Sequence, residues 1–214
     1  EFCSGLFHVQ GEASQAACAA LAPRPGEKVL DMCAAPGGKS ATLAQYMENK
    51  GALFSRDAVQ SRVPLIDETL ARLGVSCANI CCADARIYDA VLDGADAVLC
   101  DVPCTGLGVL AKKPDIRYKS LEGLEELYTV QRAILHTSAR YVRPGGRLVY
   151  STCTVNPQEN EAAVQAFLAG HPGFCLRRAG CAVPGALEAD GMAVLLPFFT
   201  QTDGFFIASL ERLW

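Results

Sequence analysis

Two cysteines stand in contexts that suit nucleophilic chemistry. Cys104 lies in Asp-Val-Pro-Cys at 101–104 and Cys153 in Ser-Thr-Cys-Thr at 151–154, and each motif directly follows a short apolar run. A thiolate can form a covalent intermediate if its surroundings activate a thiol whose ordinary pKa is about 8.5. Five other cysteines fall inside predicted helices or strands and are interpreted as small buried hydrophobic residues: Cys18, Cys77, Cys81, Cys82 and Cys100.

A glycine turn and three carboxylates form a second group. The segment 33–40 holds Gly37 and Gly38, which permit close backbone approach before a predicted helix with free amide groups. Its spacing matches neither G-x-G-x-x-G nor a P-loop, so it gives little support to phosphate binding. Asp57 follows the second predicted strand, where it can accept hydrogen bonds from a ribose diol.

Asp84 and Asp101 follow the third and fourth predicted strands, and Asp84 is placed to meet an adenine edge. One such aspartate is more often a cap or turn residue. Together with the glycine turn, the three carboxylates indicate a nucleoside ligand without a polyphosphate, for which S-adenosylmethionine is the obvious candidate.

The elements that would position these residues alternate between short apolar runs and longer amphipathic runs, which is typical of strands joined by crossover helices. This order predicts an α/β fold with a doubly wound, mostly parallel, Rossmann-like sheet, helices on both faces and an antiparallel pair at one edge. Ligands then bind beyond the carboxyl ends of the strands. We expect helices at 12–21, 39–49, 62–73, 121–141 and 159–168, and strands at 29–33, 52–55, 75–82, 97–100, 147–150, 192–196 and 204–210.

Composition excludes several classes of protein. Half of the 214 residues are hydrophobic and 20% are charged, which rules out a disordered chain, and no apolar run approaches the ~18 residues of a membrane span. Eleven cysteines, an odd number without the spacing of a secreted scaffold, predict reduced thiols in a cytoplasmic protein. The net charge of −4 gives no overall basic field, so an RNA partner would be held locally.

Several motifs together resemble the Sun/Fmu family of RNA cytosine-5 methyltransferases, over essentially the whole chain. They are Phe-His-Val-Gln at 7–10, Asp-Met-Cys-Ala-Ala-Pro-Gly-Gly-Lys at 31–39, the two cysteine motifs, Lys-Pro-Asp-Ile-Arg-Tyr at 113–118, Pro-Gln-Glu-Asn-Glu at 157–161 and Asp-Gly-Phe-Phe at 203–206. The 113–118 motif is most similar to the bacterial 16S ribosomal RNA branch. Val102 and Thr105 stand where the family usually has Ala and Ser.

The resemblance implies a class I S-adenosylmethionine-dependent methyltransferase that methylates carbon 5 of a cytosine. Cys153 would be the nucleophile that adds to carbon 6, Cys104 would assist release, and Asp101 would hydrogen-bond the base. The cofactor contacts that it implies are Cys33, Ala34, Ala35, Pro36, Gly37, Gly38, Lys39, Asp57, Arg62, Asp84 and Asp101. Lys39 also opposes the dipole of its own helix, which suggests another purpose for its charge.

The resemblance further implies one catalytic domain, with a lead-in segment at 1–26 and the core at 27–214, and an RNA-binding region upstream. We expect a monomer that binds 16S ribosomal RNA or an assembling small subunit, with phosphate contacts from Lys112, Lys113, Arg117 and Lys119 and base stacking by Phe7 or Tyr118. His8, His136 and His171 are far apart in sequence, so no metal site is expected. The alternatives are a tRNA cytosine-5 methyltransferase, a small-molecule or protein methyltransferase, and a non-catalytic ribosome-assembly module that retains the cofactor fold.

Overall fold

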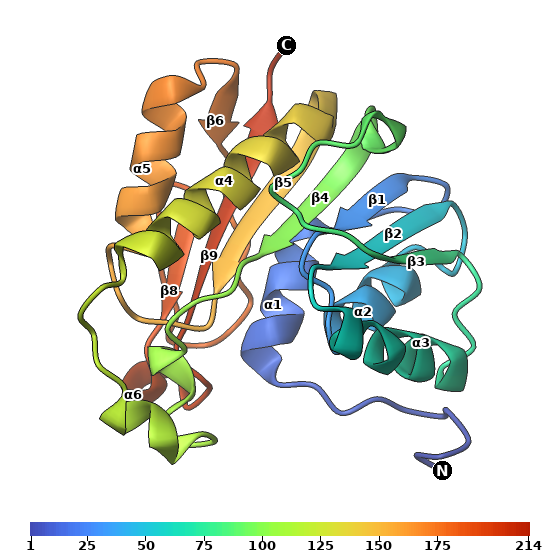
Figure 1. Ribbon diagram of the computed structural model, residues 1–214, viewed down its shortest axis with the longest axis horizontal. Helices are drawn as coiled ribbons and strands as arrows, with labels where there is room; N and C mark the ends of the chain where they lie inside the picture. Colours follow the sequence, from blue (N-terminus) through green and yellow to red (C-terminus); the bar gives the residue numbers. More distant parts are fainter.

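A computed structural model describes residues 1–214 and contains one nine-stranded sheet with the strand order β3-β2-β1-β4-β5-β9-β8-β7, in which β6 also pairs with β9 (Figure 1). Strands β1 to β5 are parallel, whereas β6 to β9 are antiparallel to their neighbours. The predicted doubly wound, mostly parallel sheet is therefore confirmed. The strands are β1 (Lys28–Asp31), β2 (Ala52–Asp57), β3 (Ala78–Cys82), β4 (Ala95–Asp101), β5 (Val142–Thr152), β6 (Phe174–Leu176), β7 (Leu187–Ala189), β8 (Met192–Leu195) and β9 (Phe205–Arg212).

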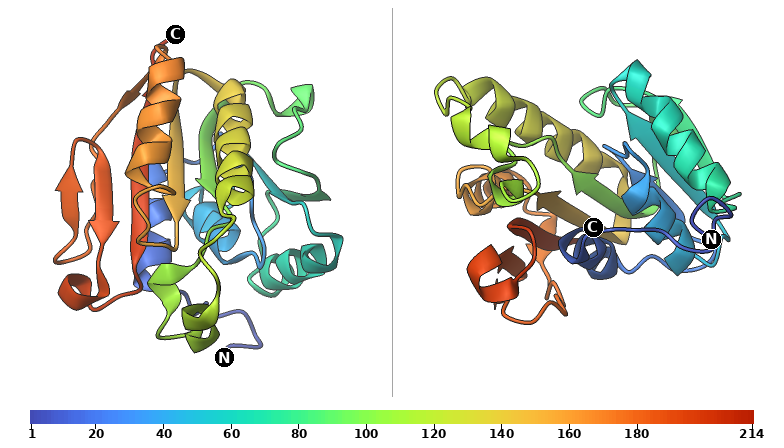
Figure 2. Two further views of the ribbon diagram at one scale, coloured as in Figure 1. Left: turned by 60° about the vertical axis from the view of Figure 1, so that its left-hand side comes forward. Right: turned by 90° about the horizontal axis from the view of Figure 1, so that it is seen from below.

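Helices cover both faces of the sheet (Figure 2). One layer holds α1 (Glu12–Leu21), α2 (Gly38–Tyr46) and α3 (Val63–Arg72), and the other holds α4 (Glu125–Tyr141) and α5 (Glu161–Gly170), while the short α6 (Pro197–Thr200) precedes β9. Successive residues of β4 enter opposite cores: Val98 packs with α4 and α5, and Leu99 packs with α1 and α2. This alternation explains why the central strands read as continuous apolar runs.

The predicted antiparallel pair is confirmed as β8 and β9, with β9 between β5 and β8 and the three-residue β7 as the outermost strand on that side. Residues 205–210 of β9 are buried without interruption. A strand with one face in water would alternate apolar and polar residues, whereas this nearly unbroken apolar run fits burial on both faces. The strands β6 and β7 were not predicted.

Two helices begin later than expected. The helix predicted from residue 121 begins at Glu125, after Gly123 has adopted a left-handed backbone with φ of 71°. The helix predicted from Glu159 begins at Glu161, because Glu159 turns its side chain into the protein interior. No helix is long and apolar enough to cross a membrane.

The strand order reverses between β1 and β4, and this position determines where a ligand binds. From β1 the chain proceeds outward to β2 and β3, then returns to add β4 and β5 on the other side of β1. Loops that leave the two sides of such a switch point diverge and open a crevice at the carboxyl ends of the strands. The glycine turn, the three aspartates and both cysteine motifs all lie at this edge.

Candidate active site

The two cysteines from distant motifs meet at this edge, with their Sγ atoms 3.2 Å apart. Strands β4 and β5 are parallel and pair Asp101 with Ser151, so that residues just beyond each strand are brought side by side. The backbone N–H of Val102 donates to the carbonyl of Ser151 at 3.1 Å and continues this alignment past the strand ends. The expected proximity of the two thiols is thus a direct result of strand register.

The contact distinguishes the two thiols electrostatically. The hydrogen bond with Cys104 lowers the pKa of Cys153, with help from the charge of Lys39 and against burial and the charge of Asp101. The same hydrogen bond, together with burial, raises the pKa of Cys104. The contact therefore favours the thiolate on Cys153 over that on Cys104. The sequence alone did not reveal this activating group.

Lys39 and Asp101 link the glycine turn to the thiol pair. The Lys39 ammonium lies 2.7 Å from Asp101 Oδ2, and the Ser151 hydroxyl donates to Asp101 Oδ1 at 2.7 Å. Burial lowers the pKa of Lys39, but the attraction of Asp101 outweighs burial and raises it overall. This ion pair explains why a cation is retained in the first turn of α2, where the helix dipole opposes it.

The glycine turn closes tightly onto the neighbouring helix. Gly37 has a φ of 100°, and a Cβ there would lie 3.1 Å from the Cα of Ile66 in α3. A Cβ on Gly38 would lie 3.1 Å from His8 Nε2. The two glycines thus allow the start of α2 to sit against α3 on one side and the lead-in segment on the other.

Beside this turn is a pocket of about 270 Å³. It is lined by Cys33, Ala34, Ala35, Pro36, Gly38, Lys39 and Asp101, and by His8, Val9, Gln10, Gly11, Ser14 and Thr69. Most of the predicted cofactor loop therefore surrounds one hollow. The contribution of residues 8–14 to this pocket was not predicted. The Phe-His-Val-Gln motif at 7–10 was the only sequence signal for it.

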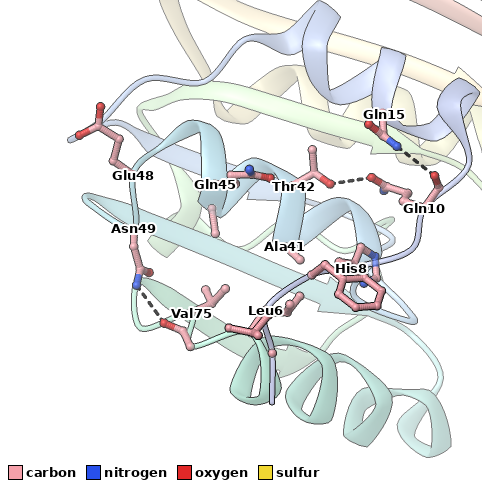
Figure 3. A pocket seen from close by; sticks show the side chains of 15 residues that line it. Leu6, His8, Gln10, Gln15, Ala41, Thr42, Gln45, Glu48, Asn49 and Val75 are labelled. Atoms are coloured by element: carbon pink, nitrogen blue, oxygen red, sulfur yellow. Dashed lines mark hydrogen bonds between the residues drawn. The ribbon is translucent and has the colours of Figure 1, made fainter. Parts of the chain in front are cut away.

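A second, larger pocket of about 600 Å³ lies between the lead-in segment and α2 (Figure 3). There the Thr42 hydroxyl donates to Gln10 Oε1 at 2.6 Å, and Gln15 donates to the Gln10 carbonyl at 2.9 Å. The first bond fixes the lead-in segment against α2, and the second lies within the lead-in segment, between α1 and the residues before it. None of the predicted catalytic or cofactor residues lines this larger pocket, so the 270 Å³ pocket is the candidate active site.

Asp57 and Arg62 lie at the rim of the glycine turn. Asp57 is almost fully buried, and its Oδ2 and Oδ1 accept from the backbone N–H groups of Ala35 at 3.2 Å and Val59 at 3.0 Å. Arg62 donates to the Ala35 carbonyl at 2.9 Å and lies 3.6 Å from Asp57 Oδ2. Each carboxylate oxygen keeps one lone pair for another donor, as a ribose diol would require.

Asp84 stands at the same edge with both oxygens engaged by Arg86. The shortest of the hydrogen bonds from Arg86 runs from its Nη2 to Asp84 Oδ2, at 2.6 Å. The hydrogen bonds from Arg86 lower the pKa of Asp84. Neither Asp84, Asp57 nor Arg62 lines the 270 Å³ pocket, so the structure places these three around it rather than within it.

Two features of the other side chains differ from expectation. The histidines are not all far apart, because His136 Nδ1 and His171 Nε2 lie 2.9 Å apart between α4 and the end of α5. Helix packing, which the sequence separation does not reveal, brings them together. Cys81 is exposed rather than buried, since it lies on the outer strand β3. The described residues contain no group of three or more His, Cys, Asp and Glu side chains that would hold a metal ion.

The residues present fit S-adenosylmethionine. The glycine turn allows close backbone approach, Asp101 contributes a carboxylate to the lining of the pocket, and Asp57 retains acceptor capacity at the rim. The pocket approaches the lower end of the ~300–1,000 Å³ that small-molecule sites span. The fold and this site together define a Rossmann-like methyltransferase with a thiol pair beside the cofactor loop.

Comparison with known proteins gives the family. The model of the family described as 16S rRNA methyltransferase RsmB/F matches residues 18–211, and the chain belongs to this family. A relative from Bacillus subtilis (strain 168), named "Probable ribosomal RNA small subunit methyltransferase B", is 39% identical over 99% of the chain and 49% of its own length. "Ribosomal RNA small subunit methyltransferase F" from Erwinia tasmaniensis is 35% identical over 100% of the chain and 46% of its own length.

Among solved structures, NSun6 from Pyrococcus horikoshii, crystallised with SFG, superposes with a TM-score of 0.87 and 33% identity over 100% of the chain and 55% of that structure. SFG is an analogue of S-adenosylmethionine, and the cofactor expectation is confirmed for this family and fold. The chain spans about half the length of the curated relatives that it matches.

Proposed function

We propose that this chain catalyses S-adenosylmethionine-dependent methylation of carbon 5 of a cytosine in 16S ribosomal RNA through a covalent intermediate on Cys153. The observation that carries the proposal is the 3.2 Å contact between Cys153 and Cys104 beside the Lys39–Asp101 ion pair. Direct methyl transfer to oxygen or nitrogen needs no thiol nucleophile. Neither thiol lines the 270 Å³ pocket, but Lys39 and Asp101, which do, act on the charge of Cys153, and its lowered pKa supports carbon methylation.

Each residue then has a chemical task. The Cys153 thiolate adds to carbon 6 of cytosine, which makes carbon 5 nucleophilic, and Asp101 accepts a hydrogen bond from the exocyclic amine or from a protonated N3. S-adenosylmethionine, when bound by the glycine turn, Asp57 and Asp84, supplies the methyl group. After transfer a base or water removes the proton from carbon 5, the Cys153–carbon 6 bond breaks, and Cys104 assists this release by donating a proton to the departing thiolate.

RNA is the proposed partner because basic and aromatic side chains stand exposed beside the thiol loop. Lys113, Arg117 and Lys119 lie in or next to a short 3₁₀ helix, η4 (Pro114–Tyr118), and the Tyr118 ring is 82% exposed. Lys112 is less free, because it pairs with Asp203 at 2.6 Å. The names of the curated relatives specify small-subunit ribosomal RNA as their substrate, which favours 16S ribosomal RNA here. All eleven cysteines are free, which agrees with action in the reducing cytoplasm.

Trapping with RNA that contains 5-fluorocytosine tests the chemistry. We expect a covalent protein–RNA adduct with the wild type, none with Cys153→Ala, and accumulation of adduct on ordinary RNA with Cys104→Ala. Cys153→Ala should still bind S-adenosylmethionine, and Cys81→Ala, which removes an exposed thiol far from the site, should behave as the wild type. Near-normal turnover by Cys153→Ala would refute the assignment of the nucleophile. Cofactor binding without any adduct or turnover would instead support a non-catalytic assembly module.

The RNA substrate needs a separate experiment. Transfer of tritium-labelled methyl groups by the full-length protein should be compared on small ribosomal subunits, free 16S ribosomal RNA and tRNA. We expect incorporation into 16S ribosomal RNA, free or assembled. Incorporation into tRNA alone would refute the ribosomal assignment while leaving the chemistry intact.

A further inference from the structure

A fully buried carboxylate, Glu159, lies behind the thiol pair and accepts four hydrogen bonds. Its Oε1 accepts from the Thr105 hydroxyl at 2.6 Å and from Asn156 Nδ2 at 3.0 Å. Its Oε2 accepts from the Thr105 backbone N–H at 2.9 Å and from Gln131 Nε2 at 2.8 Å. Every lone pair of the carboxylate is therefore used within the protein.

These partners come from the two segments that carry the thiols and from the helix between them. Thr105 directly follows Cys104, and its hydroxyl also contacts the hydroxyl of Thr154, the residue after Cys153, at 2.8 Å. The Gln131 side chain, on α4, also donates to the carbonyl of Pro103, the residue before Cys104, at 3.0 Å. The carboxylate thus binds Thr105 directly and reaches Thr154 through the Thr105 hydroxyl, while its bond to Asn156 holds the loop that follows Cys153.

The site requires a carboxylate rather than any polar group. All four partners are neutral donors, and no salt bridge involves Glu159. An amide in its place would turn an N–H group toward two of these donors and leave them unpaired in the interior. If Glu159 were purely structural, its replacement would change only the stability of the fold. If Glu159 sets the positions of the two loops, its replacement would also change the reactivity of the two thiols.

We propose that Glu159 is a positioning residue that holds the loops of Cys104 and Cys153 so that their sulfur atoms stay within hydrogen-bond distance. By keeping both loops in place, it preserves the hydrogen bond between the two sulfur atoms. The significance of this for catalysis rests on the proposed function, in which Cys153 is the nucleophile. The lowered pKa of Cys153, whose main cause is the hydrogen bond with Cys104, agrees with this role.

The test is the rate of Cys153 alkylation by iodoacetamide between pH 6 and pH 10, followed by peptide mass spectrometry on protein without RNA or cofactor. We expect Glu159→Gln to slow alkylation at pH 7 about tenfold and to raise its midpoint by about one pH unit. Glu161→Gln, the same change two residues away on a carboxylate that forms no side-chain hydrogen bond with either loop, is the matched control. An alkylation profile like that of the wild type in folded Glu159→Gln would overturn the proposal.

A double-mutant cycle separates positioning from general loosening. Cys104→Ala removes the hydrogen bond between the two sulfur atoms, so adding Glu159→Gln to that variant should cause no further slowing. An equal, additive slowing in both backgrounds would overturn the proposal, because Glu159 would then act independently of the thiol contact. If Glu159→Gln does not fold, Thr105→Ala replaces it. Thr105→Ala should slow alkylation of Cys153 about threefold in the wild-type background and cause no further slowing in the Cys104→Ala background. Since alkylation needs no RNA, a failed methylation assay leaves this test unaffected.

Discussion

Asp31, the last residue of β1, permits a quantitative test of the electrostatics beneath the active site. Its side chain is inaccessible to solvent, its Oδ2 accepts from the Ser40 hydroxyl at 2.7 Å, and its Oδ1 has no hydrogen-bond partner. Burial raises the pKa of Asp31 from 3.8 to about 6, against the lowering effects of the Ser40 hydrogen bond and the Lys39 charge. Replacement by Asn keeps the shape and the acceptor for Ser40 but removes the titration.

The sign of the effect follows from proton binding in the two states. Between pH 3.8 and about 6 the folded protein holds a proton on Asp31 that the unfolded chain has released, so Asp31 destabilises the fold increasingly as the pH rises. This destabilisation is absent below pH 3.8 and complete above about pH 6. There, the difference between a pKa of 3.8 in the unfolded chain and about 6 in the folded protein corresponds to about 3 kcal/mol. The same relation gives about 2 kcal/mol at pH 5 and about 3 kcal/mol at pH 7.5.

Urea unfolding of the wild type and Asp31→Asn at pH 5.0 and pH 7.5 measures this difference. We expect Asp31→Asn to gain about 1 kcal/mol of unfolding free energy relative to the wild type between the two pH values. A constant offset from the new amide cancels, because only the change with pH is compared. Asp67→Asn, at an exposed position on α3, should show no such change. A pH-independent difference for Asp31→Asn would refute the argument that burial controls this carboxyl.

Three further predictions concern packing and charge at the site. Gly108→Ala should lower methyl transfer at least tenfold and destabilise the fold by about 1–3 kcal/mol, because the added Cβ would overlap the backbone of Gly204 before β9. Gly170→Ala, where the added Cβ meets only open space, should be neutral in both assays. Lys39→Met leaves Asp101 without its cation and should weaken S-adenosylmethionine binding at least tenfold by calorimetry; unchanged affinity would contradict a cofactor-facing role. Leu99→Ala, in the centre of β4, should cost about 2–5 kcal/mol in urea unfolding, and a loss below 1 kcal/mol would contradict the two-sided core.

The sequence predicted the parts of the site that depend on strand order. Short apolar runs mark where each strand ends, and parallel strands place their ends at one edge. For this reason Cys104, Cys153 and Asp101 could be assigned to one place before any coordinates were known. The unusual position of the Lys39 charge, noted from the sequence, is likewise explained by its ion pair with Asp101 at that edge.

The parts that were missed depend on side-chain contacts between distant segments. Glu159 was placed inside a helix, whereas its partners Thr105 and Gln131 lie 54 and 28 residues away in the chain. The contact between His136 and His171 arises from the packing of α4 against α5. No periodicity in the sequence encodes such pairs, since periodicity reports only which face of an element is buried.

The interior position of β9 has a consequence for how the protein is made. This strand, the last in the sequence, separates β5 from β8, and the backbone N–H of Gly204 just before it donates to the carbonyl of Gly108 at 2.8 Å. Gly108 in turn donates to the carbonyl of Cys153 at 3.0 Å. During synthesis the first five strands leave the ribosome before β9 does, and non-local pairing of this kind is slow. The backbone hydrogen bonds that join Gly204, Gly108 and Cys153 therefore cannot all form until this last strand has been made, although both cysteines are synthesised earlier.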